Sequence, residues 1–274
     1  MANSGQSFQE FERAGWEDSG VVTHYHEHIS GVTRQSVDAL LDAAGVTNAS
    51  RVLDVATGAG YIAQEATRRG ADAIGVDFSA AQVRMACERH PATQFRQADA
   101  ESLPFNSESF DAVVNGFGMC HLPNPDVGLR EAFRVLKRGG RVAFTVWDMP
   151  ERAVVFGTLY AAIRAHGSMD IDLPPGPDFF LLSDPERSTR ALLSAGFVSP
   201  SCRQVPQIWR VSDADDIFRA IVDGSVRAAA ALRAQSPSVR QAIKADLGET
   251  VAAYKRGDSF EVPMPALLAT AVKT

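Results

Sequence analysis

The chain has 274 residues, of which 45% are hydrophobic and 22% are charged. This composition is typical of a globular protein with a full core, and it excludes a disordered chain, which would combine low apolar content with high net charge. The net charge of −6 argues against a nucleic-acid partner, because affinity for a polyphosphate comes from basic side chains.

Signals for membrane insertion, secretion and metal binding are weak. The longest apolar run in the middle of the chain, Ala153 to Ile163, is far shorter than the ~18 residues that a membrane span needs. Residues Met1 to Ser7 carry neither the basic nor the apolar region of a secretory signal. The three cysteines are scattered, which predicts a reducing cytoplasm and gives no metal-ligand spacing.

After residue 50, short β-rich runs alternate with amphipathic helical segments. This alternation predicts a parallel α/β sheet with crossover helices. Five strands are expected at 51–55, 73–76, 94–96, 111–114 and 141–147, with helices at 61–69, 80–89 and 126–136. Farther along, the pattern predicts helices at 153–165 and 185–195, a strand at 205–211, two helices within 213–257 and a last strand at 266–272.

We expect these elements to form one domain over residues 1–274. Residues 1–50 would be an N-terminal helical cap, and residues 51–147 would be the ligand-binding core. In open α/β sheets, ligands bind outside the carboxyl ends of the strands. Because the chain after the fifth strand leaves from that edge, segments 151–184 and 213–257 are expected to form the substrate pocket and lid.

The strongest local pattern is a glycine turn between the first strand and its helix, Thr57-Gly58-Ala59-Gly60. Glycine lets the backbone approach a ligand closely, and the N–H groups that start the next helix can bind ligand oxygens. Because Gly58-x-Gly60-x-x-Ala63 also fits a dinucleotide fingerprint, the turn alone leaves a nicotinamide-dependent oxidoreductase open. A plain strand–helix turn is the structural alternative.

Four further segments follow the turn in order: residues 75–79 (GVDFS), 98–105 (ADAESLPF), 109–114 (SFDAVV) and 131–140 (EAFRVLKRGG). Together with the turn they resemble the class I S-adenosylmethionine-dependent methyltransferases, particularly the branch related to ubiquinone/menaquinone biosynthesis C-methyltransferases. The resemblance is strongest over residues 35–147. It implies a Rossmann-like, doubly wound sheet of seven strands, mostly parallel with an antiparallel last strand, a helical N-terminal extension and helical lid insertions.

The resemblance also implies S-adenosyl-L-methionine as the cofactor. Asp77 would then accept the ribose hydroxyls, Phe78 would cover one adenine face, and Asp99 with the Ala100 backbone N–H would contact the adenine edge. For the acids, a turn or strand-end role is the competing interpretation. Asp54 would help to hold the methionine ammonium. The full set of expected cofactor residues is Asp54, Ala56, Gly58, Gly60, Asp77, Phe78, Asp99, Ala100 and Asn115.

The sequence departs from the family at one position, because the family commonly has glycine where Ala56 stands. Alanine adds one methyl group, which is tolerable if the residue keeps an extended conformation. The departure therefore bears on the shape of the loop and not on the ligand.

Methyl transfer from a sulfonium asks mainly for positioning, and a base helps only when the acceptor must lose a proton. His121, just after the fourth strand, is the first candidate, although a loop histidine bonded to the backbone explains it equally. His26 and His28 are the second candidates, and the resemblance implies that Tyr25, beside them, covers the methionine end of the cofactor. His24 and His28 share a helix face, but no third ligand spacing appears, so no metal site is expected.

Large apolar residues near the predicted strand ends favour a small, largely apolar acceptor, unless they only fill the core. They are Phe117, Met119, Trp147, Phe179 and Trp209. We therefore predict a cytoplasmic enzyme that methylates oxygen or carbon of a small acceptor by in-line displacement, with no nucleic-acid or membrane partner and with a homodimer left open. The alternatives are N-methylation of a small amine, a nicotinamide-dependent oxidoreductase and a non-catalytic cofactor-binding protein.

Overall fold

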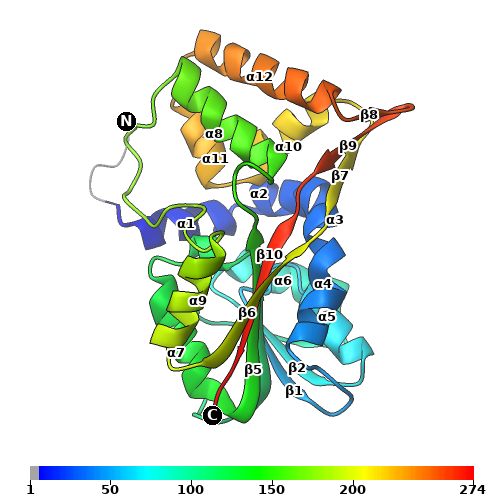
Figure 1. Ribbon diagram of the computed structural model, residues 1–274, viewed down its shortest axis with the longest axis vertical. Coiled ribbons are helices and arrows are strands. Elements are labelled where there is room, and N and C mark those ends of the chain that lie inside the picture. The colour runs from blue at the N-terminus through cyan, green and yellow to red at the C-terminus, as the bar shows by residue number, and fades with distance from the viewer. Residues whose placement is uncertain (1–5) are drawn as a thin grey trace. The chain divides into compact units, whose positions relative to one another are not determined.

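The computed structural model describes residues 6–274 (Figure 1). Residues 1–5 lie outside this range. They belong to the predicted N-terminal cap and to the segment 1–7 in which no secretory signal is expected. Contacts divide the chain into two compact units. The sheet unit comprises Thr33–Trp147, Pro177–Val205 and Ala266–Thr274, and the helical unit comprises the described residues up to Val32, Asp148–Gly176 and Pro206–Pro265.

The sheet unit contains a seven-stranded sheet in the order β3-β2-β1-β4-β5-β10-β6. β10 runs antiparallel to both of its neighbours, while the other pairs are parallel. The mostly parallel seven-stranded prediction is therefore confirmed. The strands are β1 (Arg51–Val55), β2 (Asp72–Asp77), β3 (Gln94–Gln97), β4 (Phe110–Gly116), β5 (Leu136–Trp147), β6 (Val198–Val205) and β10 (Ala266–Val272).

Helices cover both faces of this sheet. In Figure 1, α4 (Val37–Ala43) and α5 (Tyr61–Arg68) lie together on one side, and α7 (Pro125–Val135) and α9 (Pro185–Ser194) lie together on the other. A further helix, α6 (Ala80–Arg89), packs against β2 and β3. Residues 52–55 are all buried, as expected for a strand that is covered on both faces.

Capping residues set where the helices begin. The Ser79 hydroxyl accepts a hydrogen bond from the backbone N–H of Gln82, 3.1 Å away, at the start of α6. At the start of α9, the Asp184 carboxylate accepts from the N–H of Glu186 at 2.9 Å, and a proline follows as the first helical residue. Such caps satisfy N–H groups that have no partner within the helix, which fixes the position of each first turn.

The helical unit has its own small antiparallel sheet, in the order β7-β9-β8. Its helices α8 and α12 lie side by side in Figure 1. The elements are α1 (Phe8–Glu17), α2 (Ser19–His24), the π-helix η1 (Tyr25–Ile29), α8 (Val154–His166), β7 (Ile208–Val211), α10 (Asp215–Gly224), α11 (Arg227–Arg233), α12 (Pro237–Ala252), β8 (Lys255–Arg256) and β9 (Ser259–Pro263). Along the chain, the division between the two units falls within α3 (Ser30–Thr33), after Val32, and η2 (Arg34–Ser36) follows in the sheet unit.

Two expectations for the C-terminal half were wrong. The strand expected at 205–211 is only partly present, because β6 already ends at Val205 and β7 begins at Ile208 in the other sheet; Pro206 between them has no N–H to continue a ladder. Three helices, and not two, lie within 213–257. Ser225 is extended between α10 and α11, and its hydroxyl accepts a hydrogen bond from the Ala229 N–H at 3.1 Å, so one helix ends there and another begins.

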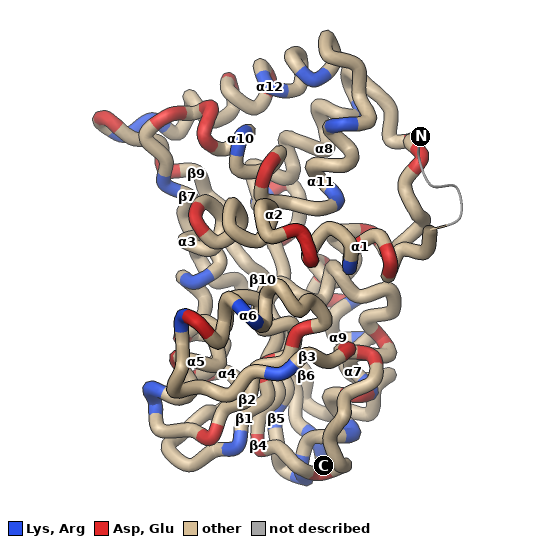
Figure 2. Tube along the Cα trace, turned by 180° about the vertical axis from the view of Figure 1, so that it is seen from behind, with Lys and Arg blue, Asp and Glu red and all other residues tan. Residues whose placement is uncertain are grey.

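No helix within residues 6–274 combines the length and apolar character that a membrane crossing requires. Figure 2 shows acidic and basic residues interspersed along the chain, in agreement with the modest net charge.

Candidate functional site

The residues predicted to bind a ligand meet at the carboxyl ends of β1, β2 and β4. β1 pairs with β2 on one side and β4 on the other, so the loops that follow these three strands leave the same edge of the sheet. The Asp77 carboxylate accepts a hydrogen bond from the Gly58 N–H at 2.9 Å. The Asn115 side-chain amide donates to the Val55 carbonyl at 2.9 Å. Residues far apart in sequence therefore converge on the glycine turn.

The turn itself depends on left-handed backbone. Gly58 has φ +55° and Gly60 has φ +85°, values that glycine adopts without steric cost. A Cβ on Gly60 would lie 2.6 Å from Cζ of Phe95, so the approach of this ring also requires glycine. The Thr57 N–H donates to the Val76 carbonyl at 2.9 Å, which ties the turn to β2.

Ala56 differs from the expectation of an extended conformation, because its φ is +56°. A left-handed alanine costs about 1–2 kcal/mol relative to right-handed backbone. Its methyl group is accommodated by Gly118, where an added Cβ would lie 2.5 Å from the Ala56 Cβ and 2.7 Å from Nδ2 of Asn115. The loops after β1 and β4 thus pack together through one methyl group and one glycine.

Asp54 is a fully buried carboxyl at the end of β1. Its Oδ2 accepts hydrogen bonds from the Thr57 hydroxyl at 2.5 Å and the Ala63 N–H at 3.1 Å. Its Oδ1 is buried and has no hydrogen-bond partner among the described residues. Burial raises the pKa of Asp54 to about 7, the two hydrogen bonds oppose this rise, and the charge of Asp77 adds to it. A buried acceptor of this kind suits a ligand group that carries a positive charge or N–H donors.

Asp77, at the end of β2, is buried, and its carboxylate bonds to the glycine turn and to the start of α6. Besides the bond from Gly58, its Oδ1 accepts from the N–H of Ser79 at 2.9 Å. These two bonds fix the orientation of the carboxylate at the end of β2.

The segment after β3 lies against the end of β2, because the Ala98 N–H donates to the Asp77 carbonyl at 2.9 Å. Oδ1 of Asp99 accepts from the Glu101 N–H at 2.9 Å, which is the turn considered as the competing role for this residue. Phe78 is half-buried, and its carbonyl accepts from the Gln97 side chain at 2.9 Å. The roles of Phe78, Asp99 and Ala100 toward a ligand stay predictions.

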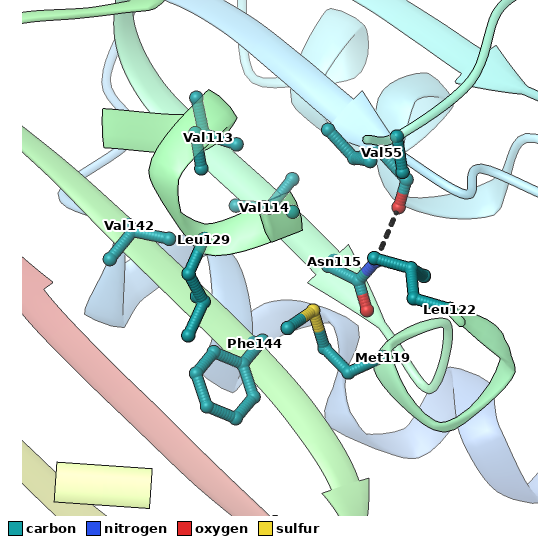
Figure 3. Close-up of a pocket in the computed structure, with 12 residues that line it drawn as sticks. Val55, Val113, Val114, Asn115, Met119, Leu122, Leu129, Val142 and Phe144 are labelled. Atoms are coloured by element: carbon teal, nitrogen blue, oxygen red, sulfur yellow. Dashed lines mark hydrogen bonds between the residues drawn. The ribbon is translucent and has the colours of Figure 1, made fainter. Parts of the chain in front are cut away.

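A water-sized apolar hollow is lined mainly by residues of β4, β5 and α7 (Figure 3). Asn115, Met119 and Ala100 line it together with core residues such as Leu129 and Phe144. Its small size and apolar walls make it a packing defect of the core and not the ligand site, although it lies beside the predicted residues.

The loop after β4 places several predicted pocket residues together. The rings of Phe117 and Trp147 are 4.5 Å apart between centroids, and both side chains are buried. Phe117 has φ +59°, a rare conformation for an aromatic residue, of a kind that clusters at functional sites. His121 ends the short helix η3 (Met119–His121), with its N–H bonded to the Gly118 carbonyl at 3.0 Å.

The remaining candidates are divided between the units. Phe179 belongs to the sheet unit and packs edge-on against Phe180, with ring centroids 5.1 Å apart. Trp209, in β7, is buried in the helical unit. Tyr25 and His26 lie in η1 of the helical unit, where the Tyr25 ring packs edge-on against Trp16 at 5.4 Å.

Sequence reasoning missed Thr57 and Gly118 as site residues. A hydroxyl three residues after a strand-end aspartate is a local signal that could have identified Thr57. No local signal marks Gly118, whose importance arises only from its contact with Ala56 in three dimensions.

Residues 53–144, which contain most of these features, match a family model described as "Methyltransferase domain". This segment is therefore similar to methyltransferases, and the seven-stranded sheet that contains it has a methyltransferase fold. The chain is 37% identical over 117 residues to a demethylmenaquinone methyltransferase of Streptomyces griseus, a match that covers 43% of this chain and 50% of the relative. It is 43% identical over 112 residues to a ubiquinone/menaquinone biosynthesis C-methyltransferase of Rhizobium etli, covering 36% and 43%.

The matches to these two methyltransferases span half or less of the relatives' length. Among solved structures, the phosphoethanolamine N-methyltransferase 2 of Haemonchus contortus in complex with S-adenosyl-L-methionine aligns with a TM-score of 0.60 at 19% identity. That alignment covers 98% of this chain and 60% of the other. At this level of identity, the likeness shows the methyltransferase fold.

Proposed function

We propose that this chain transfers a methyl group from S-adenosylmethionine to carbon or oxygen of a small, largely apolar acceptor. The observation that carries the proposal is the convergence of Asp54, the glycine turn and Asp77 at the carboxyl edge of the sheet. S-adenosylmethionine supplies a methyl group that its sulfonium already activates, so the protein has mainly to bind, orient and exclude water.

The residues present fit this cofactor. The partnerless buried Oδ1 of Asp54 suits the methionine ammonium, directly or through a water molecule. The bonds from Gly58 and Ser79 hold the Asp77 carboxylate at the end of β2, and its place in the family motif assigns it to the two ribose hydroxyls. Phe78 and Asp99, which follow β2 and β3, are assigned to the adenine ring by their place in the family motif.

On the acceptor side, His121 is the group that can remove a proton when the acceptor must lose one, since it ends the short helix after β4. Tyr25 and His26, in η1, stay predictions from the sequence. Phe117 and Trp147 form a packed aromatic pair beside this loop, which favours an acceptor with a flat, apolar ring.

The Streptomyces griseus relative is named as a demethylmenaquinone methyltransferase, and the Rhizobium etli relative as a ubiquinone/menaquinone biosynthesis C-methyltransferase. We therefore propose a quinone-type ring carbon as the first acceptor class to test. The nicotinamide alternative has no dehydrogenase-type catalytic pair to support it. All three cysteines are free, in agreement with the proposed cytoplasmic setting.

The first experiment is calorimetric titration of the chain with S-adenosylhomocysteine, followed by assay of labelled methyl transfer to naphthoquinols, phenols and amines. Binding together with label on a quinol or phenol supports the proposal. An Asp77→Asn variant of equal stability is the matched control, and it should bind more weakly. If S-adenosylhomocysteine does not bind, or if only NADH gives a saturable fluorescence titration, the proposal is wrong.

A further inference from the structure

A second group of ligating side chains lies where α2 continues into η1, in the helical unit. His24, Glu27 and His28 each offer one ligating atom, and these atoms all lie within 4.8 Å of one another. The two imidazole rings are nearly parallel, with centroids 5.9 Å apart and an interplanar angle of 20°. Oε2 of Glu27 is 3.9 Å from Nε2 of His28.

The helical backbone explains why the three side chains meet. Residues three and four positions apart share a face of a helix, so Glu27 and His28 both lie beside His24. The sequence pattern offered two histidines at a metal-binding separation, and the structure supplies the carboxylate as a third candidate ligand. Between them, Tyr25 contacts Trp16 and is not part of this group.

The backbone under the group is held in place. A Cβ on Gly224 would lie 2.9 Å from the Tyr25 nitrogen and 3.1 Å from the His24 carbonyl carbon, so the end of α10 packs directly against the first residues of η1. On the other side, Ile29 is buried and the Ser30 hydroxyl donates to the His26 carbonyl at 2.5 Å. The backbone that carries the three candidate ligands is therefore already held in place, which reduces the conformational entropy that the protein loses when an ion binds.

The side chains themselves are accessible, since those of His28 and Glu27 are 51% and 55% exposed. An ion can reach them from solvent without opening the fold. Ligand atoms about 2.0–2.2 Å from a tetrahedral zinc ion stand roughly 3.4 Å from one another, so these side chains, whose atoms lie within 4.8 Å, close on one ion by rotating toward it.

We propose that His24, Glu27 and His28 bind one zinc ion, with water in the fourth position. Two imidazole nitrogens and one carboxylate oxygen are ligand types that zinc accepts, whereas magnesium and calcium prefer sites made of oxygen. The bound ion would link α2 to η1 across the change from α- to π-helix. The three ligands are not among the residues assigned to S-adenosylmethionine, and zinc binding is measured without any methyl-transfer assay, so its failure would be distinguishable from failure of the proposed function.

The test is a zinc titration of the full chain, stripped of metal with a chelator, in competition with a chromophoric zinc indicator. We expect one zinc ion per chain, and a loss of affinity of about tenfold or more in His24→Ala and in His28→Ala, because each removes one of three ligands. Glu27→Gln should also weaken binding. The matched control is His166→Ala, which removes a histidine paired with Asp246 elsewhere in this unit and should leave zinc affinity unchanged.

Cobalt(II) provides a second readout, because its visible absorption is intense in four-coordinate sites and weak in six-coordinate ones. An intense band that is lost in His24→Ala, in a variant whose circular dichroism is unchanged, would support the assignment. The proposal is overturned if zinc does not bind, if it binds equally to the His24, Glu27 and His28 variants, or if magnesium binds as tightly as zinc.

Discussion

Replacing Asp54 by asparagine should stabilise the protein without ligand at pH 8 and weaken its binding of S-adenosylhomocysteine. Burial raises the pKa of this carboxyl from 3.8 to about 7 in the folded chain. That rise corresponds to about 4 kcal/mol. Because the folded state keeps a proton that the unfolded state has released, stability is lost as the pH rises from 3.8 to about 7, and the cost is constant above that pH.

Asparagine removes this cost but introduces a smaller one. Its amide oxygen can accept the bonds that Oδ2 now takes from Thr57 and Ala63. Its amide nitrogen would then stand in place of the partnerless Oδ1 and remain without an acceptor, which costs about 1–3 kcal/mol. We therefore expect a net stabilisation of about 1–3 kcal/mol at pH 8.

The assay is urea unfolding of both proteins at pH 5 and pH 8, with S-adenosylhomocysteine titrations at the same pH values. The advantage of Asp54→Asn should shrink by about 2–3 kcal/mol at pH 5, where Asp54 is largely protonated in the folded state. Affinity of the parent protein should rise with pH up to about 7, and the variant should lose this dependence. A variant that is less stable than the parent at pH 8, or that keeps the same pH profile of binding, would refute the assignment.

Three further predictions concern the same site. Asp77→Ala should lower the affinity for S-adenosylhomocysteine by about 1–3 kcal/mol in calorimetry, and an unchanged titration would mean that the ribose is held elsewhere. His121→Ala should reduce turnover by about a hundredfold or more while leaving S-adenosylhomocysteine binding intact, and a loss below about threefold would limit this residue to a backbone role. Gly118→Ala should destabilise the fold by about 1–3 kcal/mol. Adding Ala56→Gly should recover part of that loss in urea unfolding, whereas strictly additive effects would show that the two residues do not contact each other.

The parts of the fold that the sequence predicted best are those where local pattern and tertiary burial agree. The expected bounds of β1, α6 and β10 coincide with the observed ones. Residues 52–55 of β1 are all buried and, apart from Asp54, apolar, and α6 begins at a serine cap that can be recognised in the sequence. For the site, the family resemblance implied Asp54, Asp77 and Asn115 as cofactor residues, and the structure has them in β1, β2 and β4, at the same edge of the sheet.

The rest depended on contacts that local pattern does not record. Nothing near Ala56 in the sequence indicates that its φ is positive, because the conformation is made tolerable by Gly118, more than sixty residues away. The strand expected at 205–211 did not show that β6 extends from Val198 to Val205, or that the chain joins a different sheet after Pro206. The spacing of the histidines did not indicate Glu27 as a third candidate ligand, because its closeness to His24 and His28 depends on the helical conformation of this segment.

The place of β10 between β5 and β6 has a consequence for how the sheet is completed. β6 has β10 as its neighbour in the sheet, and β10 begins about sixty residues after β6 ends. During synthesis, β6 therefore leaves the ribosome well before its pairing partner, while the edge of β5 is also left without a neighbour. Any nascent or truncated chain that stops before Ala266 exposes two unpaired strand edges, and such species should associate with chaperones or aggregate.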